Sequence, residues 1–140
     1  RELNEEFYNR FGVLSMTTNN NNDEMWDKYA NNHKGFCVGY DTSLLFNYVS
    51  GGGNVEYFEE LPPIHFGIDD FEEEHIKMIY HKEKKWEFEE EYRLHKMWKG
   101  NVTEDMRSIK LPPECVVKII LGKNMSKKDK EEIRDIVGKK

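Results

Sequence analysis

Four glutamates occur within five positions of the stretch WEFEEEYRLH, residues 86–95, and an arginine follows them closely. Because side chains alternate between the two faces of a strand, an extended conformation would separate the polar residues of this stretch from the apolar ones. The polar face would hold Glu87, Glu89, Glu91, Arg93 and His95. Crowded carboxylates repel and raise one another's pKa unless a cation lies close, and Arg93 is two positions from Glu91. The pattern predicts a half-buried strand over 86–98 whose charged face lines a site, with a solvated charge run as the simpler alternative.

The elements that must position this strand are predicted from apolar periodicity and turn residues. We expect further strands over 11–18, 36–41, 55–61 and 115–122, and helices over 24–34, 69–85 and 126–140. The three glycines at 51–53 are expected to form a flexible loop, because no strand-to-helix nucleotide-binding pattern surrounds them. Strands and helices that do not alternate regularly predict an α+β fold, with a small mixed or antiparallel sheet and flanking helices.

Two of the predicted helices carry recognisable start signals. Asn22 or Asp23 is placed to cap the first, and Ser126 with Asp129 forms a short capping pattern at the last. The last helix is expected to turn its apolar residues inward, and these are Ile133, Ile136 and Val137.

Composition limits the domain organisation and the class of protein. A chain of 140 residues suits one domain, 1–140, and its aromatic share of 13% compensates for a hydrophobic fraction of 37%. The net charge of −6 argues against general nucleic-acid or anionic-membrane binding, although it is compatible with a local basic groove. Two distant cysteines, the lack of a signal peptide and the lack of an apolar run of about 20 residues predict a cytoplasmic location without a membrane segment. Because the chain begins at Arg1 rather than Met, we expect it to be the C-terminal portion of a longer protein.

Three blocks of the sequence carry a family resemblance. They are VLSMTTNNNNDEMWDKYANNHKGFCVGYD, WEFEEEYRLH and LPPECVVKIILGKNMS. Together they resemble the bacterial domain-of-unknown-function family 2971, whose recurrent pattern is S-x-[ST], MW-x-x-YA-x-x-HKG, W-x-x-E-x-E-[YW]-R and a strand ending in I-I-L-G. In this chain the four motifs fall at 15–17, 25–35, 86–93 and 119–122. Members of that family carry an N-terminal Asn-Asp-Pro motif that is absent here, which agrees with a missing N-terminal part.

The order of these motifs is also similar to the catalytic skeleton of the ADP-ribosyltransferases. In those enzymes a first strand carries Arg or His, a second a Ser-Thr-Ser-like motif, and a later strand the catalytic Glu of a Glu-x-Glu pair. The resemblance implies a similar fold with NAD as the substrate, Glu91 as the catalytic carboxylate and Glu89 as the auxiliary one. It also implies that Ser15 and Thr17 are supporting hydroxyls. The Arg or His motif would lie in the missing N-terminal segment.

The chemistry implied by this resemblance explains the residue types. Cleavage of the nicotinamide–ribose bond builds positive charge on the ribose, and a carboxylate bonded to a ribose hydroxyl stabilises it by ~3 kcal/mol. Arg93 would orient the glutamates or bind a phosphate. Trp26 or Tyr29 would stack on a planar base, although aromatic residues at helical spacing are more often part of a core. A bacterial defence or toxin role with an unidentified macromolecular target is implied as well.

Two alternatives belong to other functional classes. A non-catalytic recognition domain of a defence or regulatory protein would leave the 87–95 face flat and exposed, whereas an enzyme needs Glu91 to cluster with Ser15 in a concave, partly dry pocket. A metal-dependent nuclease is suggested only by the Glu-x-Lys pair of Glu83 and Lys85. Because the histidines lack metal-ligand spacing with Cys or carboxylates, we expect no metal site.

Overall fold

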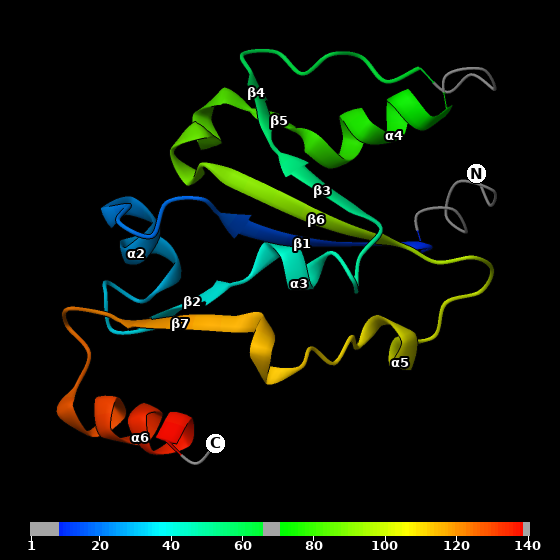
Figure 1. Ribbon diagram of the computed structural model, residues 1–140. Coiled ribbons are helices and arrows are strands. Elements are labelled where there is room, and N and C mark those ends of the chain that lie inside the picture. Colours follow the sequence, from blue (N-terminus) through cyan, green and yellow to red (C-terminus); the bar gives the residue numbers. More distant parts are fainter. Residues whose placement is uncertain (1–8, 66–70, 139–140) are drawn as a thin grey trace.

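A computed structural model describes residues 9–65 and 71–138, and it confirms the α+β class (Figure 1). The strands are β1 (Phe11–Thr17), β2 (Phe36–Tyr40), β3 (Gly51–Asn54), β4 (Glu56–Phe58), β5 (His81–Glu83), β6 (Glu91–Met97) and β7 (Val116–Leu121). The helices are α2 (Asp23–Tyr29), α3 (Thr42–Leu45), α4 (Phe71–Tyr80), α5 (Glu104–Arg107) and α6 (Lys127–Gly138), with the 3-10 helices η1 (Lys84–Glu89) and η2 (Pro113–Cys115). Residues 69–70 and 139–140 of the predicted helices lie outside the described residues.

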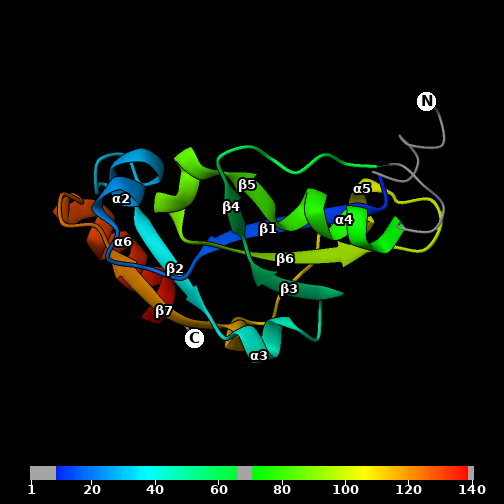
Figure 2. The same cartoon turned by 90° about the horizontal axis from the view of Figure 1, so that it is seen from above.

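The strands form three small sheets. β6 lies between β1 and β3 in an antiparallel sheet, β2 and β7 form a second antiparallel sheet, and β4 pairs in parallel with β5. Figures 1 and 2 show the β2–β7 pair beside β1, with α6 on the outer side of β7. The edge strand β1 and the strand β2 therefore belong to different sheets but border the same space.

The strand predicted over 86–98 is shorter than expected. It begins at Glu91, and the preceding residues form η1, because Glu90 has the left-handed conformation φ 44°, ψ 53° that interrupts strand alternation. The residue that follows β1 holds this conformation, since the Thr18 backbone N–H and hydroxyl both donate to the Glu90 carbonyl. The predicted single face of five charged residues is consequently wrong. Glu87 pairs with Lys84 at the surface, on the other side of the interruption.

The predicted glycine loop at 51–53 is instead the strand β3, which pairs with β6. A Cβ atom on Gly52 would lie 2.5 Å from Leu94 Cδ2, and one on Gly51 would lie 2.6 Å from His95 Cε1. Side chains of β6 occupy the space that larger residues would need, so these glycines permit close approach rather than flexibility.

The helix predicted over 69–85 ends at Tyr80, and the chain continues into β5. The helix ends there because of a tertiary contact: residues 81–83 pair with β4 as the strand β5, which places Tyr57 opposite Lys82. β4 is also shorter than the strand predicted over 55–61.

The turn after α2 packs against the end of β7. Asn22 caps α2 as predicted, accepting a hydrogen bond from the Met25 backbone N–H at 3.2 Å. The helix ends earlier than expected, since residues 31–33 have φ values of 49°, 53° and 61°. Gly122 donates its backbone N–H to the Gly35 carbonyl at 3.0 Å, and a Cβ on Gly122 would lie 2.1 Å from the His33 carbonyl oxygen. The HKG and ILG segments thus pack backbone against backbone.

The core lies where the two antiparallel sheets meet. Leu45 of α3, Leu94 of β6 and Cys115 of η2 are almost fully buried, and Tyr40 of β2 packs against them. Capping of α6 by Ser126 and Asp129 is confirmed. Its inward apolar face is not, because Ile136 and Val137 are exposed. None of the described helices has the length and apolarity needed to cross a bilayer.

Candidate active site

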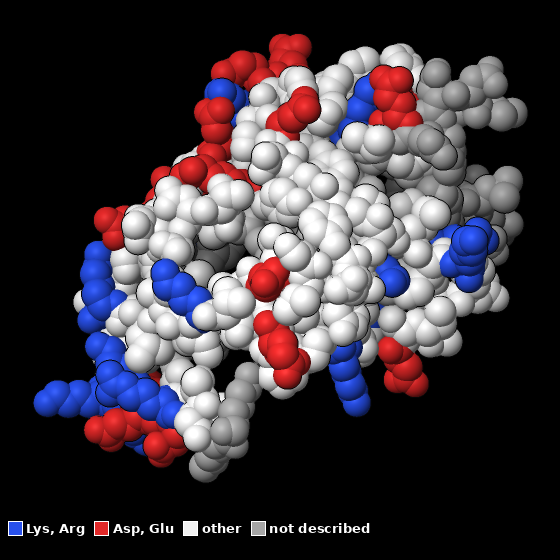
Figure 3. Space-filling model, viewed as in Figure 1, with Lys and Arg blue, Asp and Glu red and all other residues white. Residues whose placement is uncertain are grey.

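A cleft of about 1000 Å³ opens between β1 and β2, with β5, η1, β6 and β7 contributing to its walls. Figure 3 shows a hollow between the surfaces that overlie β1 and β2. Its volume is at the upper end of the ~300–1,000 Å³ that is usual for small-molecule sites. The charged residues that line it are Lys82, Glu89, Glu91, Arg93 and Lys118.

Glu91 lies at the start of β6 and is only 6% exposed. Arg93 binds its carboxylate in a bidentate manner, with Nε 2.9 Å from Oε1 and Nη2 2.9 Å from Oε2. The Lys82 Nζ donates to Oε2 at 3.1 Å. The Glu91 backbone N–H donates to the Tyr57 hydroxyl at 2.8 Å, which fixes the position of the strand end. The buried charge is therefore fully paired, as burial of a carboxylate requires.

These contacts determine the protonation state of Glu91. Burial alone would raise the pKa of the carboxyl, but hydrogen bonds outweigh burial and lower the pKa from 4.5 to about 2. The donors are Arg93, Ser15 and Lys82. Glu91 is therefore an anion at neutral pH, and it is suited to stabilise positive charge rather than to donate a proton.

Glu89 reaches the same cleft from the end of η1 and is also buried. Its Oε2 accepts a hydrogen bond from Lys82 Nζ at 2.5 Å, and its Oε1 accepts one from the Tyr29 hydroxyl at 2.6 Å. The hydrogen bond to Glu89 raises the pKa of Tyr29, so the phenol remains a donor at neutral pH. The chain of contacts from Tyr29 through Glu89 and Lys82 to Glu91 joins α2, η1, β5 and β6.

Lys82 is the residue of this cluster that the sequence did not reveal. Burial lowers the pKa of Lys82, but its hydrogen bonds to Glu89 and Glu91 outweigh burial and raise it, so the ammonium persists. It lies in a lysine-rich segment predicted to be helical, and nothing in its spacing distinguishes it from Lys84 or Lys85. Only the pairing of β5 with β4 brings it to the glutamates.

The two hydroxyl residues of β1 line the cleft, opposite Arg93 and Glu91 in the strand register. Ser15 is exposed and hydrogen-bonds to the Glu91 carboxylate. The Thr17 hydroxyl is engaged locally, since it accepts the Asn19 backbone N–H at 3.1 Å. Of the two, Ser15 is the hydroxyl that contacts the carboxylate.

Of the two residues predicted to stack on a base, only Tyr29 lines the cleft. Tyr29 lines the cleft and is 62% exposed. Trp26 points elsewhere: its ring stacks on His33, with centroids 5.5 Å apart, and its indole N–H donates to the Asn20 carbonyl at 2.7 Å. Six of the seven predicted site residues thus line one cleft, and Trp26 instead packs α2 against the turn that follows it.

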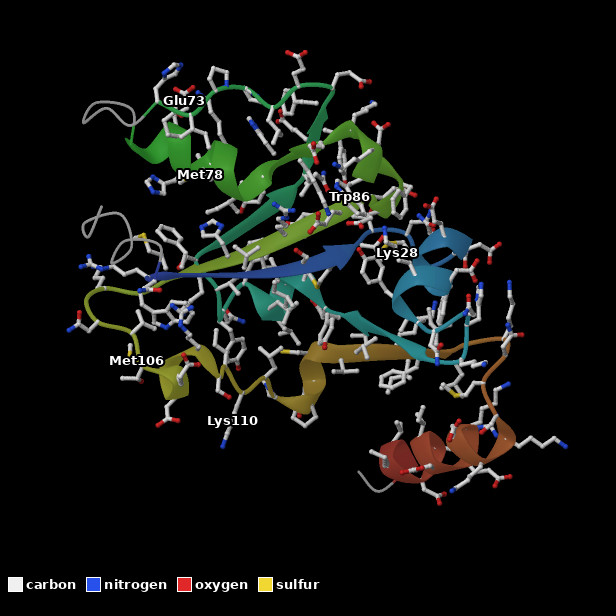
Figure 4. All side chains as sticks on the ribbon, turned by 180° about the vertical axis from the view of Figure 1, so that it is seen from behind. Lys28, Glu73, Met78, Trp86, Met106 and Lys110 are labelled. Atoms are coloured by element: carbon white, nitrogen blue, oxygen red, sulfur yellow. The ribbon has the colours of Figure 1, made fainter. Side chains whose placement is uncertain are left out.

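A cation–aromatic cluster holds η1 against α2. The Lys28 ammonium lies 4.0 Å from the centroid of the Trp86 ring and 4.8 Å from that of Phe88. Figure 4 shows Lys28 and Trp86 converging from these two elements. Contacts of this kind contribute ~0.5–2 kcal/mol each, and here they position the loop that carries Glu89.

The Glu-x-Lys pair lies outside the cleft. Glu83 and Lys85 form an exposed ion pair with each other, at 2.5 Å. Among residues 9–65 and 71–138, no group of three or more His, Cys, Asp or Glu side chains is arranged to hold a metal ion. The geometry adds no observation that favours the nuclease alternative.

Comparison with known proteins finds no match among family models, curated proteins or solved structures.

Proposed function

We propose that this cleft cleaves the nicotinamide–ribose bond of NAD, as an ADP-ribosyltransferase or NAD glycohydrolase does, with Glu91 as the catalytic carboxylate. The observation that carries the proposal is the buried, ionised Glu91, which clusters with Ser15, Lys82 and Arg93 in a concave cleft. A flat, exposed charged face would have favoured a recognition domain instead. The proposal extends to membership of the bacterial family 2971, a cytoplasmic location, and a defence or toxin role.

In the proposed reaction, the bond between ribose C1′ and the nicotinamide nitrogen breaks, and its electron pair neutralises the pyridinium. Positive charge then develops on C1′ and the ring oxygen. Glu91 accepts a hydrogen bond from a ribose hydroxyl and stabilises that charge. A nucleophile, either water or a group on a macromolecule, attacks C1′ and releases its proton. Glu89 is placed to take this proton, because its carboxylate lies beside Glu91 on the same lysine.

The hydrogen bonds of Glu91 define what must change when substrate binds. A carboxylate offers about four lone-pair positions, and Arg93, Lys82 and Ser15 together supply four donors. A ribose hydroxyl must therefore replace one of them. Ser15 is the donor that yields most easily, since it is exposed and its hydroxyl rotates, whereas Arg93 is also fixed by the Ile79 carbonyl.

Nicotinamide release from NAD tests the proposal. Glu91→Gln should reduce the rate by ~100-fold or more, the usual consequence of removing one group that stabilises transition-state charge. Glu87→Gln is the matched control, because Glu87 lies in the same segment but is exposed and outside the cleft. Its rate should stay within about twofold of wild type. Circular dichroism and thermal unfolding establish that both variants fold.

The proposal fails if the wild-type protein releases no nicotinamide and NAD does not raise its unfolding temperature. It also fails if Glu91→Gln keeps the wild-type rate. Either result would favour the recognition-domain alternative.

A further inference from the structure

The charge of the cleft differs from the charge of the chain. Three cationic side chains and two carboxylates line it, so it carries one net positive charge, although the whole chain carries −6. Such a local excess attracts an anionic ligand into an otherwise acidic protein. Lys82 and Arg93 are already held by the glutamates. Among the described residues, Lys118 has no ion-pair partner.

Lys118 lies on β7, in the sheet opposite the one that carries Glu91. Its neighbour across the β2–β7 pair is Gly39, and a Cβ atom there would lie 3.2 Å from the Lys118 Cβ. Because Gly39 has no side chain, the strand surface is open beside the aliphatic part of the Lys118 side chain. Immediately after Gly39 the register of the pair shifts, and Tyr40 and Thr42 also line the cleft. Figure 3 shows both basic and acidic side chains on the side of the hollow toward β7.

We propose that Lys118 and Gly39 form a phosphate subsite, so that the cleft holds a dinucleotide through its pyrophosphate and binds it more tightly than a nucleoside. A lysine ammonium is a compact point charge suited to a phosphate, and a glycine beside it lets the phosphate approach the backbone. The cleft volume of about 1000 Å³ provides room for a ligand larger than one nucleoside. The inference rests on the proposed function for the placement of the ribose at Glu91.

The test measures binding, which does not require catalysis. Affinities for ADP-ribose, which contains a pyrophosphate, and for nicotinamide riboside, which contains none, are compared by calorimetry. Lys118→Ala should weaken ADP-ribose binding by about tenfold, as expected for loss of one charged hydrogen bond, and leave nicotinamide riboside binding unchanged. Lys118→Arg should restore most of the affinity. Lys110→Ala is the control, because Lys110 is exposed, lies outside the cleft and points into solvent in Figure 4.

The outcomes separate the subsite from the glycosidic chemistry. Suppose that Lys118→Ala weakens ADP-ribose binding but the wild-type protein releases no nicotinamide. That result would support the subsite and overturn the reaction. The opposite result is that nicotinamide release depends on Glu91, while Lys118→Ala changes neither the affinity for ADP-ribose nor the KM for NAD. That result would support the reaction and overturn the subsite. Equal loss of both ligands in Lys118→Ala, or no binding of ADP-ribose by wild type, would also overturn the subsite.

Discussion

The carboxylate of Glu91 is an anion held inside the protein by two cations and a hydroxyl. Burying an unpaired charge costs several kcal/mol, and removing one partner of a buried pair typically costs ~3–5 kcal/mol. Arg93 and Lys82 therefore stabilise the folded protein, because each holds the buried Glu91 carboxylate. Their hydrogen bonds keep the Glu91 carboxylate ionised beside the cleft at neutral pH.

This arrangement predicts a specific dependence of stability on pH. The pKa of Glu91 is about 2 in the folded protein and 4.5 in its ordinary state, so the unfolded chain binds the proton more tightly. The stabilisation is fully present above pH 4.5 and is lost as the pH falls to about 2. The shift corresponds to ~3 kcal/mol. Urea unfolding from pH 2 to 7 should show this additional loss in wild type and not in Glu91→Gln; parallel curves would contradict it.

At the scale of the elements, one backbone contact and one side-chain contact place the cleft walls. Gly122, just after β7, lies against the turn that follows α2, and this contact holds the β2–β7 pair to the segment that carries Tyr29. The cation–aromatic contact of Lys28 and Trp86 holds η1 to the same helix. α2 is thus the element through which both walls are joined.

Gly122→Ala tests the backbone contact. The new methyl group would lie 2.1 Å from the His33 carbonyl oxygen, so the backbone must move, and we expect a loss of ~3 kcal/mol in the free energy of unfolding. Gly138→Ala is the matched control, because a Cβ there meets no atom within 4 Å, and its effect should stay within ~1 kcal/mol. Urea denaturation measures both. Equal effects of the two substitutions would show that the contact is not as tight as the structure has it.

At the scale of the whole molecule, the cleft is the space left between two sheets that join at one core. Leu45 and Leu94 of that core are each 1% exposed, and residues of both sheets pack around them. Because the sheets share this cluster, we expect them to unfold together.

Leu45→Ala should therefore destabilise the entire protein by ~2–5 kcal/mol, since it leaves a cavity in the shared core. Leu44→Ala, at the adjacent and 36% exposed position, should cost less than ~1 kcal/mol. Far-ultraviolet circular dichroism and tryptophan fluorescence should report coincident transitions in urea. Separate transitions for the two probes would mean that the sheets unfold independently.

The sequence by itself determined the α+β class, the strands β1, β2 and β7, and the caps of α2 and α6. These features depend on local patterns of apolar residues and on side chains within one helical turn. The motifs also identified six residues that line one cleft, including Glu89, Glu91 and Arg93, although they misplaced Trp26.

Only the tertiary structure decided the interruption at Glu90, the strand formed by 51–54, and the positions of Lys82 and Lys118 in the cleft. Each depends on a partner distant in sequence. Thr18, just after β1, holds Glu90, and β6 pairs with the glycines. β4 pairs with β5, and this pairing brings Lys82 to the glutamates. Local propensity does not encode such pairings, because their free energy comes from contacts that exist only once the sheets have assembled.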